Sequence, residues 1–270
     1  MSHGSLMLEP MRKGETVRRA LLIEAGVAAV AVATARRRPV IGLLAAGGGA
    51  LVAWGAFARN SPLYGSVVHK GSPTGPRFAL TFDDGPGPST PAVLDALREA
   101  DAHATFFVLG RQVERHPEVV RRIVAEGHEL ANHGYDHGIL VFRTPAHVQE
   151  QLERTEHAVS AAAGQDALTR VFRAPHGFRS PATTIAARRA GYRLAGWSAG
   201  VFDSAQPGAD VIADRACRAL RPGGVLLLHD ADGWDPTASR AQTAAAIVPI
   251  CRTARARGLE PVALGELVSG

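Results

Sequence analysis

The chain has 270 residues, of which 46% are apolar and 20% charged, with a formal net charge of +5. This length allows one large domain, and two cysteines, Cys217 and Cys251, exclude a disulfide-rich scaffold. Residues 1–60 hold eight Lys or Arg and three acidic residues, whereas residues 61–270 hold 22 of each sign. The large domain is therefore neutral, which argues against a nucleic-acid partner. We interpret both cysteines as buried thiols, with a single disulfide as the alternative in an extracytoplasmic domain.

The N-terminal arm, residues 1–60, is predicted to be a basic segment with one or two membrane-spanning helices. Residues 39–58 carry no charge and are long enough to cross a bilayer as a helix. Three arginines at 36–38 precede this stretch, so the positive-inside rule places the large domain outside the cell membrane. A shorter apolar stretch, residues 20–35, is either a first span or an interfacial helix.

Two other interpretations of residues 39–58 stay open. The triplet 56–58 fits the A-x-A pattern of a signal-peptide cleavage site, and cleavage there would make the remaining domain a secreted one. A soluble core helix is the other alternative, although the stretch is apolar all round.

A domain over residues 77–270 follows a linker or surface strap, residues 61–76, that is rich in Gly and Pro. In this domain short apolar runs alternate with helical stretches. The runs are often apolar on both faces, as parallel strands covered by helices are. The predicted strands are Phe78–Phe82, Ala104–Leu109, Glu129–Asn132, Arg170–Arg173, Leu194–Ser198, Val225–Leu228 and Pro261–Leu264.

Proline and glycine mark the helices between these strands. Proline is favoured in the first turn of a helix, and glycine just past its last turn. About seven β/α units in order predict a parallel sheet rolled into a barrel, with an open doubly wound sheet as the alternative. The predicted helix starts are Thr90-Pro91, His116-Pro117, Thr144-Pro145 and Ser180-Pro181, and the closing glycines are Gly127, Gly164 and Gly191.

Two adjacent acids, Asp83 and Asp84, directly follow the first predicted strand and precede a Gly-Pro turn. Adjacent carboxylates at the end of a buried strand repel each other unless a positive group lies there. One carboxylate can bind a cation while its neighbour stays free to move a proton. Further polar residues follow other predicted strands, at the edge where parallel α/β folds build active sites. These residues are His133, Arg173, Asp203, His229 and Asp230.

His133 and His137 are four residues apart, so a helical turn from Gly134 onward would point both rings the same way. Together with an acid from another strand end, they make a His₂-carboxylate set with open coordination positions. That set suits a catalytic Zn²⁺ or a similar divalent ion rather than a closed structural site. The neighbouring His128 is more simply interpreted as a structural residue.

Four motifs occur in order along residues 77–266. They resemble those of the polysaccharide deacetylase family, which is carbohydrate esterase family 4 or the NodB-homology domain. The resemblance implies a distorted (β/α)7 barrel that removes N- or O-acetyl groups from chitin, peptidoglycan, xylan and related sugars. The motifs are Thr81-Phe-Asp-Asp-Gly-Pro86, Asn132-His-x-x-x-His137, Phe172-Arg-Ala-Pro175 and Leu226-Leu-Leu-His-Asp230.

The resemblance also implies a role for each matching residue. Asp84, His133 and His137 would be the ligands of a divalent metal, Zn²⁺ or alternatively Co²⁺. The remaining residues would act on the substrate. Asp83 would be the general base, with Arg173 as its ion-pair partner, and His229 would be the general acid, with Asp203 orienting it. Leu227 would form a wall of the acetyl pocket, and Pro175 and His176 would bind substrate. A backbone N–H near His176 would complete an oxyanion hole.

Four positions depart from the family pattern. Gly134 stands where Ser or Thr is usual, which removes a hydrogen bond expected to brace the metal ligands. His176 replaces an aromatic residue of the groove, Gly200 replaces an acid, and Ser204 replaces a Trp, which is expected to widen the acyl pocket. These departures leave the ligands, base and acid intact and place the doubt on substrate preference.

The sequence as a whole therefore predicts a membrane-anchored, metal-dependent enzyme that deacetylates cell-wall glycan, either peptidoglycan or a chitin-like oligosaccharide. One alternative is a hydrolase for a formyl group, another acyl group or a non-sugar amide. A second is a glycan-binding protein without turnover. A phosphotransferase is poorly supported, because no phosphate-binding glycine-rich loop follows a strand.

Overall fold

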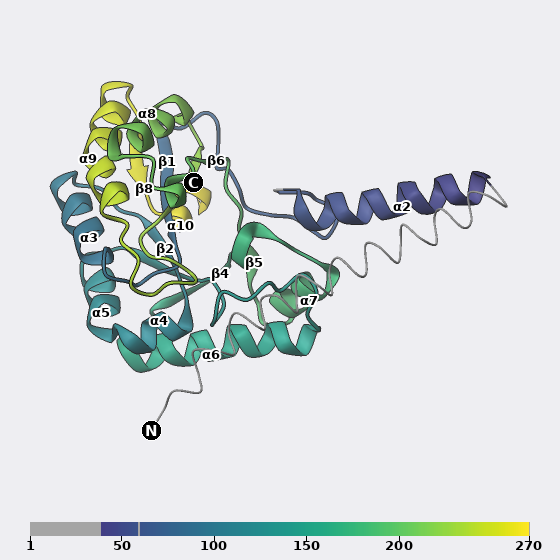
Figure 1. Cartoon of the computed structure of the whole chain (residues 1–270). Helices are drawn as coiled ribbons and strands as arrows, with labels where there is room; N and C mark the ends of the chain where they lie inside the picture. Colours follow the sequence, from purple (N-terminus) through teal and green to yellow (C-terminus); the bar gives the residue numbers. More distant parts are fainter. Residues whose placement is uncertain (1–38, 59, 270) are drawn as a thin grey trace.

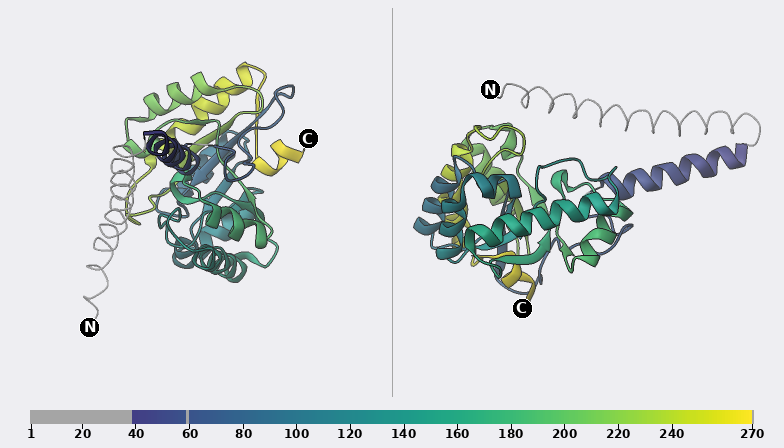
Figure 2. Two further views of the ribbon diagram at one scale, coloured as in Figure 1. Left: turned by 90° about the vertical axis from the view of Figure 1, so that its right-hand side faces the viewer. Right: turned by 90° about the horizontal axis from the view of Figure 1, so that it is seen from below.

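The computed structural model describes residues 39–58 and 60–269, and within them the side chains from residue 47 onward. Helix α2 (Pro39–Phe57) extends away from the folded domain, which it meets at its C-terminal end (Figures 1 and 2). In the described part of the chain, no helix is both long enough and apolar enough to cross a membrane. The span predicted over 39–58 is therefore not supported. The span predicted over 20–35 and the arginines at 36–38 lie outside the described residues.

The domain is built on one curled sheet in which every strand pair is parallel. The strand order is β5-β4-β3-β2-β1-β7-β6, and β8 pairs with β1 beside this path. The sheet forms an open half-barrel, which is the (β/α)7 architecture predicted from the sequence in its distorted form. Its strands are β1 (Arg77–Asp83), β2 (Thr105–Val108), β3 (Glu129–Asn132), β4 (Leu168–Phe172), β5 (Arg193–Leu194), β6 (Ala199–Gly200), β7 (Val225–His229) and β8 (Glu260–Val262).

The strand predicted over 194–198 is wrong. Within that range only Leu194 lies in a strand, because β5 ends at Leu194 and β6 begins at Ala199, and these two strands lie at opposite ends of the strand order. Residues 195–198, the crossing segment, connect these two edges of the sheet. Their backbone groups bond to a different partner at each end of the segment. The N–H of Gly196 donates to the carbonyl of Val68 at 2.8 Å, and the N–H of Ser198 donates to that of Val225 at 2.9 Å.

The four predicted helix starts are confirmed, each with proline in its first turn. The hydroxyls of Thr144 and Ser180 cap two of these helices by accepting from backbone N–H groups at 3.3 Å. The three predicted closing glycines all adopt positive φ. The helices of the domain are α3 (Thr90–Glu99), α4 (Gly110–Arg115), α5 (Pro117–Ala125), α6 (Pro145–Ala163), α7 (Pro181–Arg189), α8 (Ala209–Ala219), α9 (Ala241–Ala256) and α10 (Leu264–Ser269), with 3₁₀ turns η1 (Pro175–Gly177) and η2 (Asp203–Ala205).

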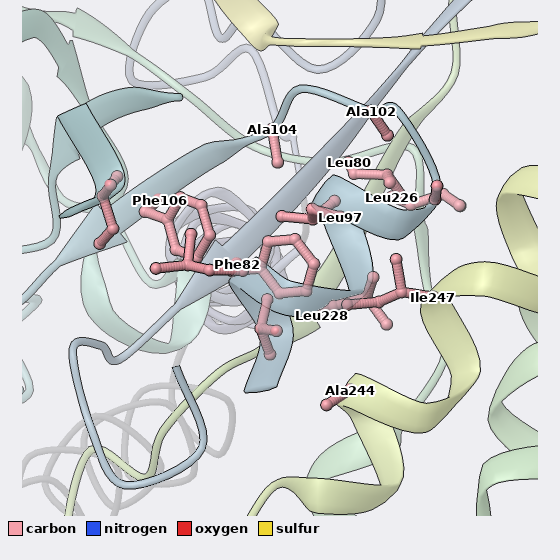
Figure 3. Close-up of a cluster of buried hydrophobic side chains, with 14 of the residues drawn as sticks. Leu80, Phe82, Leu97, Ala102, Ala104, Phe106, Leu226, Leu228, Ala244 and Ile247 are labelled. Carbon is pink, nitrogen blue, oxygen red and sulfur yellow. The ribbon is translucent and has the colours of Figure 1, made fainter. Parts of the chain in front are cut away.

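Side chains of β1 alternate between the two faces of the sheet. Phe78, Leu80 and Phe82 pack under the outer helices in the largest apolar cluster, part of which Figure 3 shows. Ala79 faces inward, in a second cluster with Phe107 and other residues of the barrel interior. The same period of two places Thr81 and Asp83 on the interior face. Cys217 and Cys251, on α8 and α9, are both free thiols.

Residues 60–68 pack as a surface strap along the crossing segment. The N–H of Val68 donates to the carbonyl of Leu194 at 2.8 Å, and the side-chain amide of Asn60 donates to the carbonyl of Trp197 at 2.8 Å. The end of α2 is held as well, since Arg179 donates its backbone N–H to Ala56 at 3.0 Å. At residues 60 and 68 the chain therefore lies against the domain, as the strap alternative for residues 61–76 expects.

Candidate active site

The candidate site lies at the carboxyl ends of β1, β3, β4 and β7, as the sequence predicts. Strands β1 and β7 pair in register, with Asp83 opposite His229, so both side chains point to the same face. Asp83 and His229 border a cavity of about 690 Å³. The cavity is lined by Asp83, Asp84, His133, His137, His176, Gly177, Trp197, Gly200, Val201, Phe202, Asp203, Ser204, Leu227, His229, Asp232, Gly233, Trp234 and Arg240.

Three buried residues form a candidate metal centre. One atom from each of Asp84, His133 and His137 lies within 4.8 Å of the others. The Asp84 Oδ1 atom is 3.1 Å from Nε2 of His137 and 3.4 Å from Nε2 of His133. Among the described residues, this oxygen has no hydrogen-bond partner. A buried carboxylate oxygen aimed between two imidazole nitrogens suits a divalent cation.

The surroundings of this triad keep its ligand atoms available. Nδ1 of His133 lies 2.8 Å from the carbonyl oxygen of Arg173, which can only accept a proton. That bond assigns the ring proton to Nδ1 and leaves the Nε2 lone pair facing Asp84. Gly233 donates its N–H to Oδ2 of Asp84 at 3.0 Å. Burial alone would raise the pKa of Asp84, but the His137 and His133 imidazoles hold it well below its ordinary value. The residues present therefore fit a divalent ion.

The helical turn expected from Gly134 is wrong. Residues 133–138 form a loop in which Gly134 and His137 have φ angles of 83° and 60°. The backbone bonds of this loop go to side chains rather than to a helix. The N–H of Gly134 donates to Asn132 Oδ1 at 2.8 Å, and the N–H groups of Tyr135 and Asp136 both donate to Oε1 of Gln151. These bonds brace the histidine loop without the hydroxyl that is missing at Gly134.

Asp83 is held by the buried guanidinium of Arg173. Nη1 of Arg173 donates to Oδ1 of Asp83 at 2.6 Å and to the hydroxyl of Thr81 at 2.9 Å. Nη2 donates to the carbonyl of Gly196 at 2.7 Å, and the guanidinium lies 3.9 Å from the ring centre of Phe107. Burial lowers the pKa of Arg173, and Asp83 opposes that change. The predicted pairing of Asp83 with Arg173 is thus present in the structure.

His229 is paired with Asp203, as the sequence predicts. Nδ1 of His229 lies 2.9 Å from Oδ1 of Asp203, whose Oδ2 accepts from the backbone N–H of His229 at 2.7 Å. The hydroxyl of Thr243 donates to the same Oδ2 at 2.9 Å. Burial acts to lower the pKa of His229, but the charge of Asp203, the hydrogen bond to it and the charges of Asp84 and Asp83 together raise the pKa to about 9. His229 is therefore a cation at neutral pH, able to donate a proton from Nε2.

The remaining predicted residues lie in different places. Leu227 and His176 line the cavity, whereas Pro175 is buried beside Gly134 and does not line it. His176 has a positive φ of 62°, and its ring lies 4.5 Å from that of His137. The family acid is absent at Gly200, where a Cβ atom would lie 3.4 Å from the Trp197 indole nitrogen. An aromatic ring therefore bounds this side of the cavity, although position 204 is serine.

Sequence reasoning missed the loop after β7. Gly233 bonds to Asp84, and the Trp234 ring lies 5.2 Å from that of His137 and 5.7 Å from that of His176. Its position after a strand end that carries His229 was the available signal. The adjacent Asp230 is fully buried, and burial raises its pKa to about 7 against the opposing bond from Thr90.

Comparison with known proteins gives a consistent result. The model of the family described as polysaccharide deacetylase matches residues 70–195. A chitooligosaccharide deacetylase from Bradyrhizobium sp. is 39% identical over 216 residues, which is 76% of this chain and 97% of that protein. A peptidoglycan-N-acetylglucosamine deacetylase from Bacillus cereus is 33% identical over 194 residues, covering 71% of this chain and 87% of that protein.

A solved structure has the same fold. It is the Bc1960 peptidoglycan N-acetylglucosamine deacetylase, crystallised with 4-naphthalen-1-yl-N-oxidanyl-benzamide. It superposes with a TM-score of 0.69 at 28% identity and covers 74% of this chain and 92% of that chain.

Proposed function

The chain belongs to the polysaccharide deacetylase family, and we propose that it hydrolyses the acetamido groups of an N-acetylated glycan, releasing acetate. The substrate class follows the names of its relatives, which act on chitooligosaccharide and on peptidoglycan. The observation that carries the proposal is the pairing of Asp83 and His229 across adjacent strands beside the Asp84-His133-His137 cluster. A base and an acid at a candidate metal centre are what amide hydrolysis needs.

The candidate metal would be Zn²⁺, with Co²⁺ as the alternative, because two imidazoles and one carboxylate leave coordination positions open. When bound by Asp84, His133 and His137, such an ion supplies Lewis acidity toward the acyl carbonyl oxygen and toward water. The metal dependence and the identity of the ion are parts of this proposal.

Asp83 would act as the general base. Arg173 donates to the Oδ1 atom of Asp83 and fixes it, which leaves Oδ2 available to take a proton from the attacking water. Asp83 Oδ2 lies 3.7 Å from Nε2 of His133, so the base sits next to the candidate ligands. Arg173 is a positioning residue, because its guanidinium acts through Asp83.

His229 would act as the general acid. Its Nδ1 is engaged by Asp203, so Nε2 is the atom that donates a proton to the departing amine. An amine leaves poorly unless it is protonated, and the raised pKa of His229 keeps this proton in place at neutral pH. Leu227 and His176 would contact the substrate, and a backbone N–H near His176 would stabilise the developing oxyanion.

A hydrolase for a formyl group, another acyl group or a non-sugar amide is a second candidate, which Ser204 in place of the family Trp keeps open. Binding without turnover is a third candidate. The location of the domain outside the cell membrane stays a prediction. It rests on the uncharged stretch 39–58 and its preceding arginines, and the described helices do not support a span.

The test is acetate release by the full chain from N-acetylglucosamine oligomers and from peptidoglycan, after chelation and after adding back Zn²⁺ or Co²⁺. We expect release that requires metal, that Asp83→Asn and His229→Gln abolish, and that Asp95→Asn leaves intact. Calorimetric titration with Zn²⁺ should show binding in Asp83→Asn and its loss in Asp84→Asn. Release that survives chelation, or both active-site substitutions, would overturn the proposal.

A further inference from the structure

Phe202 is an exposed aromatic residue at the edge of the catalytic cavity. Its exposed fraction of 74% is the highest of any large apolar side chain in the described part of the chain. Phe202 nevertheless lines the cavity that also contains Asp84, His133 and His137. Most of its ring surface therefore remains in water beside the cavity, where a ligand that covered it would remove apolar area from water.

The backbone conformation at position 202 is unfavourable for phenylalanine. Phe202 has φ 56° and ψ 38°, in the left-handed region that Gly and Asn adopt more easily than a bulky residue. Its neighbours impose this conformation, since Val201 is buried and Asp203 bonds to both His229 and Thr243. The loop thus requires a left-handed residue at 202, and it does not require an aromatic one.

We propose that Phe202 is a stacking platform for a pyranose ring of the glycan, next to the sugar whose acetamido group is hydrolysed. Pyranose rings present apolar C–H faces, and an exposed phenyl ring offers a flat apolar surface of matching size. The immediate link from Phe202 to Asp203, and from there to His229, places the platform beside the catalytic acid. The inference rests on the proposed function and adds to it a binding subsite for a longer oligosaccharide.

The conformation of Phe202 gives the proposal a distinctive test. Phe202→Ala should raise KM for N-acetylglucosamine oligomers roughly tenfold, which corresponds to about 1.4 kcal/mol of binding. It should change kcat less than about threefold and leave kcat/KM for the monosaccharide unchanged. Phe202→Trp should keep the oligomer KM at the wild-type value, unlike Phe202→Ala. Phe202→Asn should lose oligomer affinity to the same degree and yet melt at an equal or higher temperature, because Asn tolerates the left-handed backbone.

Phe142→Ala is the matched control, because Phe142 is 43% exposed and does not line the cavity. It should leave the oligomer KM unchanged. An equal loss for monosaccharide and oligomer in Phe202→Ala, or a lower melting temperature in Phe202→Asn, would overturn the platform.

Binding measurements separate this inference from the proposed function. Calorimetric titration of an oligomer into Asp83→Asn, with and without Phe202→Ala, measures how much Phe202 contributes to oligomer affinity in the absence of turnover. Equal affinity of the two proteins would refute the platform even if the enzyme releases acetate. Weaker binding with Phe202→Ala, in a chain that releases no acetate, would support the platform and refute the deacetylase proposal.

Discussion

The Asp203–His229 pair gives a sharp prediction for the pH dependence of catalysis. In the folded chain burial acts to lower the pKa of His229, and Asp203, through its charge and hydrogen bond, raises it to about 9 with smaller help from Asp84 and Asp83. Replacing Asp203 by Asn removes the charge and keeps the shape of the side chain. The His229 pKa should then fall to its ordinary value of 6.5 or below, since burial remains.

The size of the effect follows from the fraction of His229 that carries the proton. At pH 8 about 90% is protonated with a pKa of about 9, and about 3% with a pKa of 6.5. We therefore expect Asp203→Asn to lower kcat/KM at pH 8 by about 30-fold and to lower it far less at pH 6.

The assay is the pH profile of kcat/KM between pH 5 and 10, measured with N-acetylglucosamine oligomers at a fixed metal concentration. In the wild-type chain, activity should fall as the pH rises through 9, where His229 loses its proton. In Asp203→Asn this alkaline limb should move down by at least two pH units. Asp232→Asn is the control, because Asp232 lines the same cavity but pairs with Arg240. An unchanged alkaline limb in Asp203→Asn would refute the assignment of His229 as the acid.

Three further predictions concern stability. Burial lowers the pKa of His128 to about 4, and the charge of His103 adds to this shift. The stability that the neutral His128 ring contributes is therefore present above pH 6.5 and lost as the pH falls toward 4. Urea unfolding should show a loss of about 2 kcal/mol in the free energy of unfolding between pH 7.5 and 5, which His128→Leu removes and His157→Leu does not. Asp83→Ala should cost about 3–5 kcal/mol in the same assay, because the Arg173 guanidinium is left buried without its counter-charge, and a cost below about 1 kcal/mol would contradict that reasoning. A Cβ atom at Gly196 would lie 2.0 Å from Oδ1 of Asn60, so Gly196→Ala should destabilise the chain by about 1–3 kcal/mol, and a double-mutant cycle with Asn60→Ala should recover more than half of that loss.

The sequence predicted the elements whose signals are local. The four helix starts at prolines are in place because proline fits the first turn of a helix, where its missing N–H costs nothing. The acids after β1 and the histidine after β7 face each other because parallel strands bring their carboxyl ends to one edge. The local sequence around each proline and the position of each polar residue after a strand were sufficient to predict the helix starts and the site residues.

The predictions that failed depended on long-range contacts. The spacing of His133 and His137 suggested a helical turn, but Gln151, from α6, takes up two backbone N–H groups of that loop. The segment 194–198 looked like one strand, but its backbone bonds are divided between the strap at Val68 and β7 at Val225. No local pattern shows where a backbone group finds a partner 15 or more residues away.

The strap and the C-terminal end of α2 are both bonded or packed against the domain that contains the cavity. Asn60 and Val68 bond to the crossing segment, whose Gly196 carbonyl in turn holds Arg173. On the other side, the Phe57 ring lies 5.0 Å from that of Phe178, in the loop that carries His176. The C-terminal end of α2 is therefore held at Ala56 and Phe57 by the loop that follows His176, and the strap is held by the segment that positions Arg173, so both ends of the strap are coupled to the walls of the cavity.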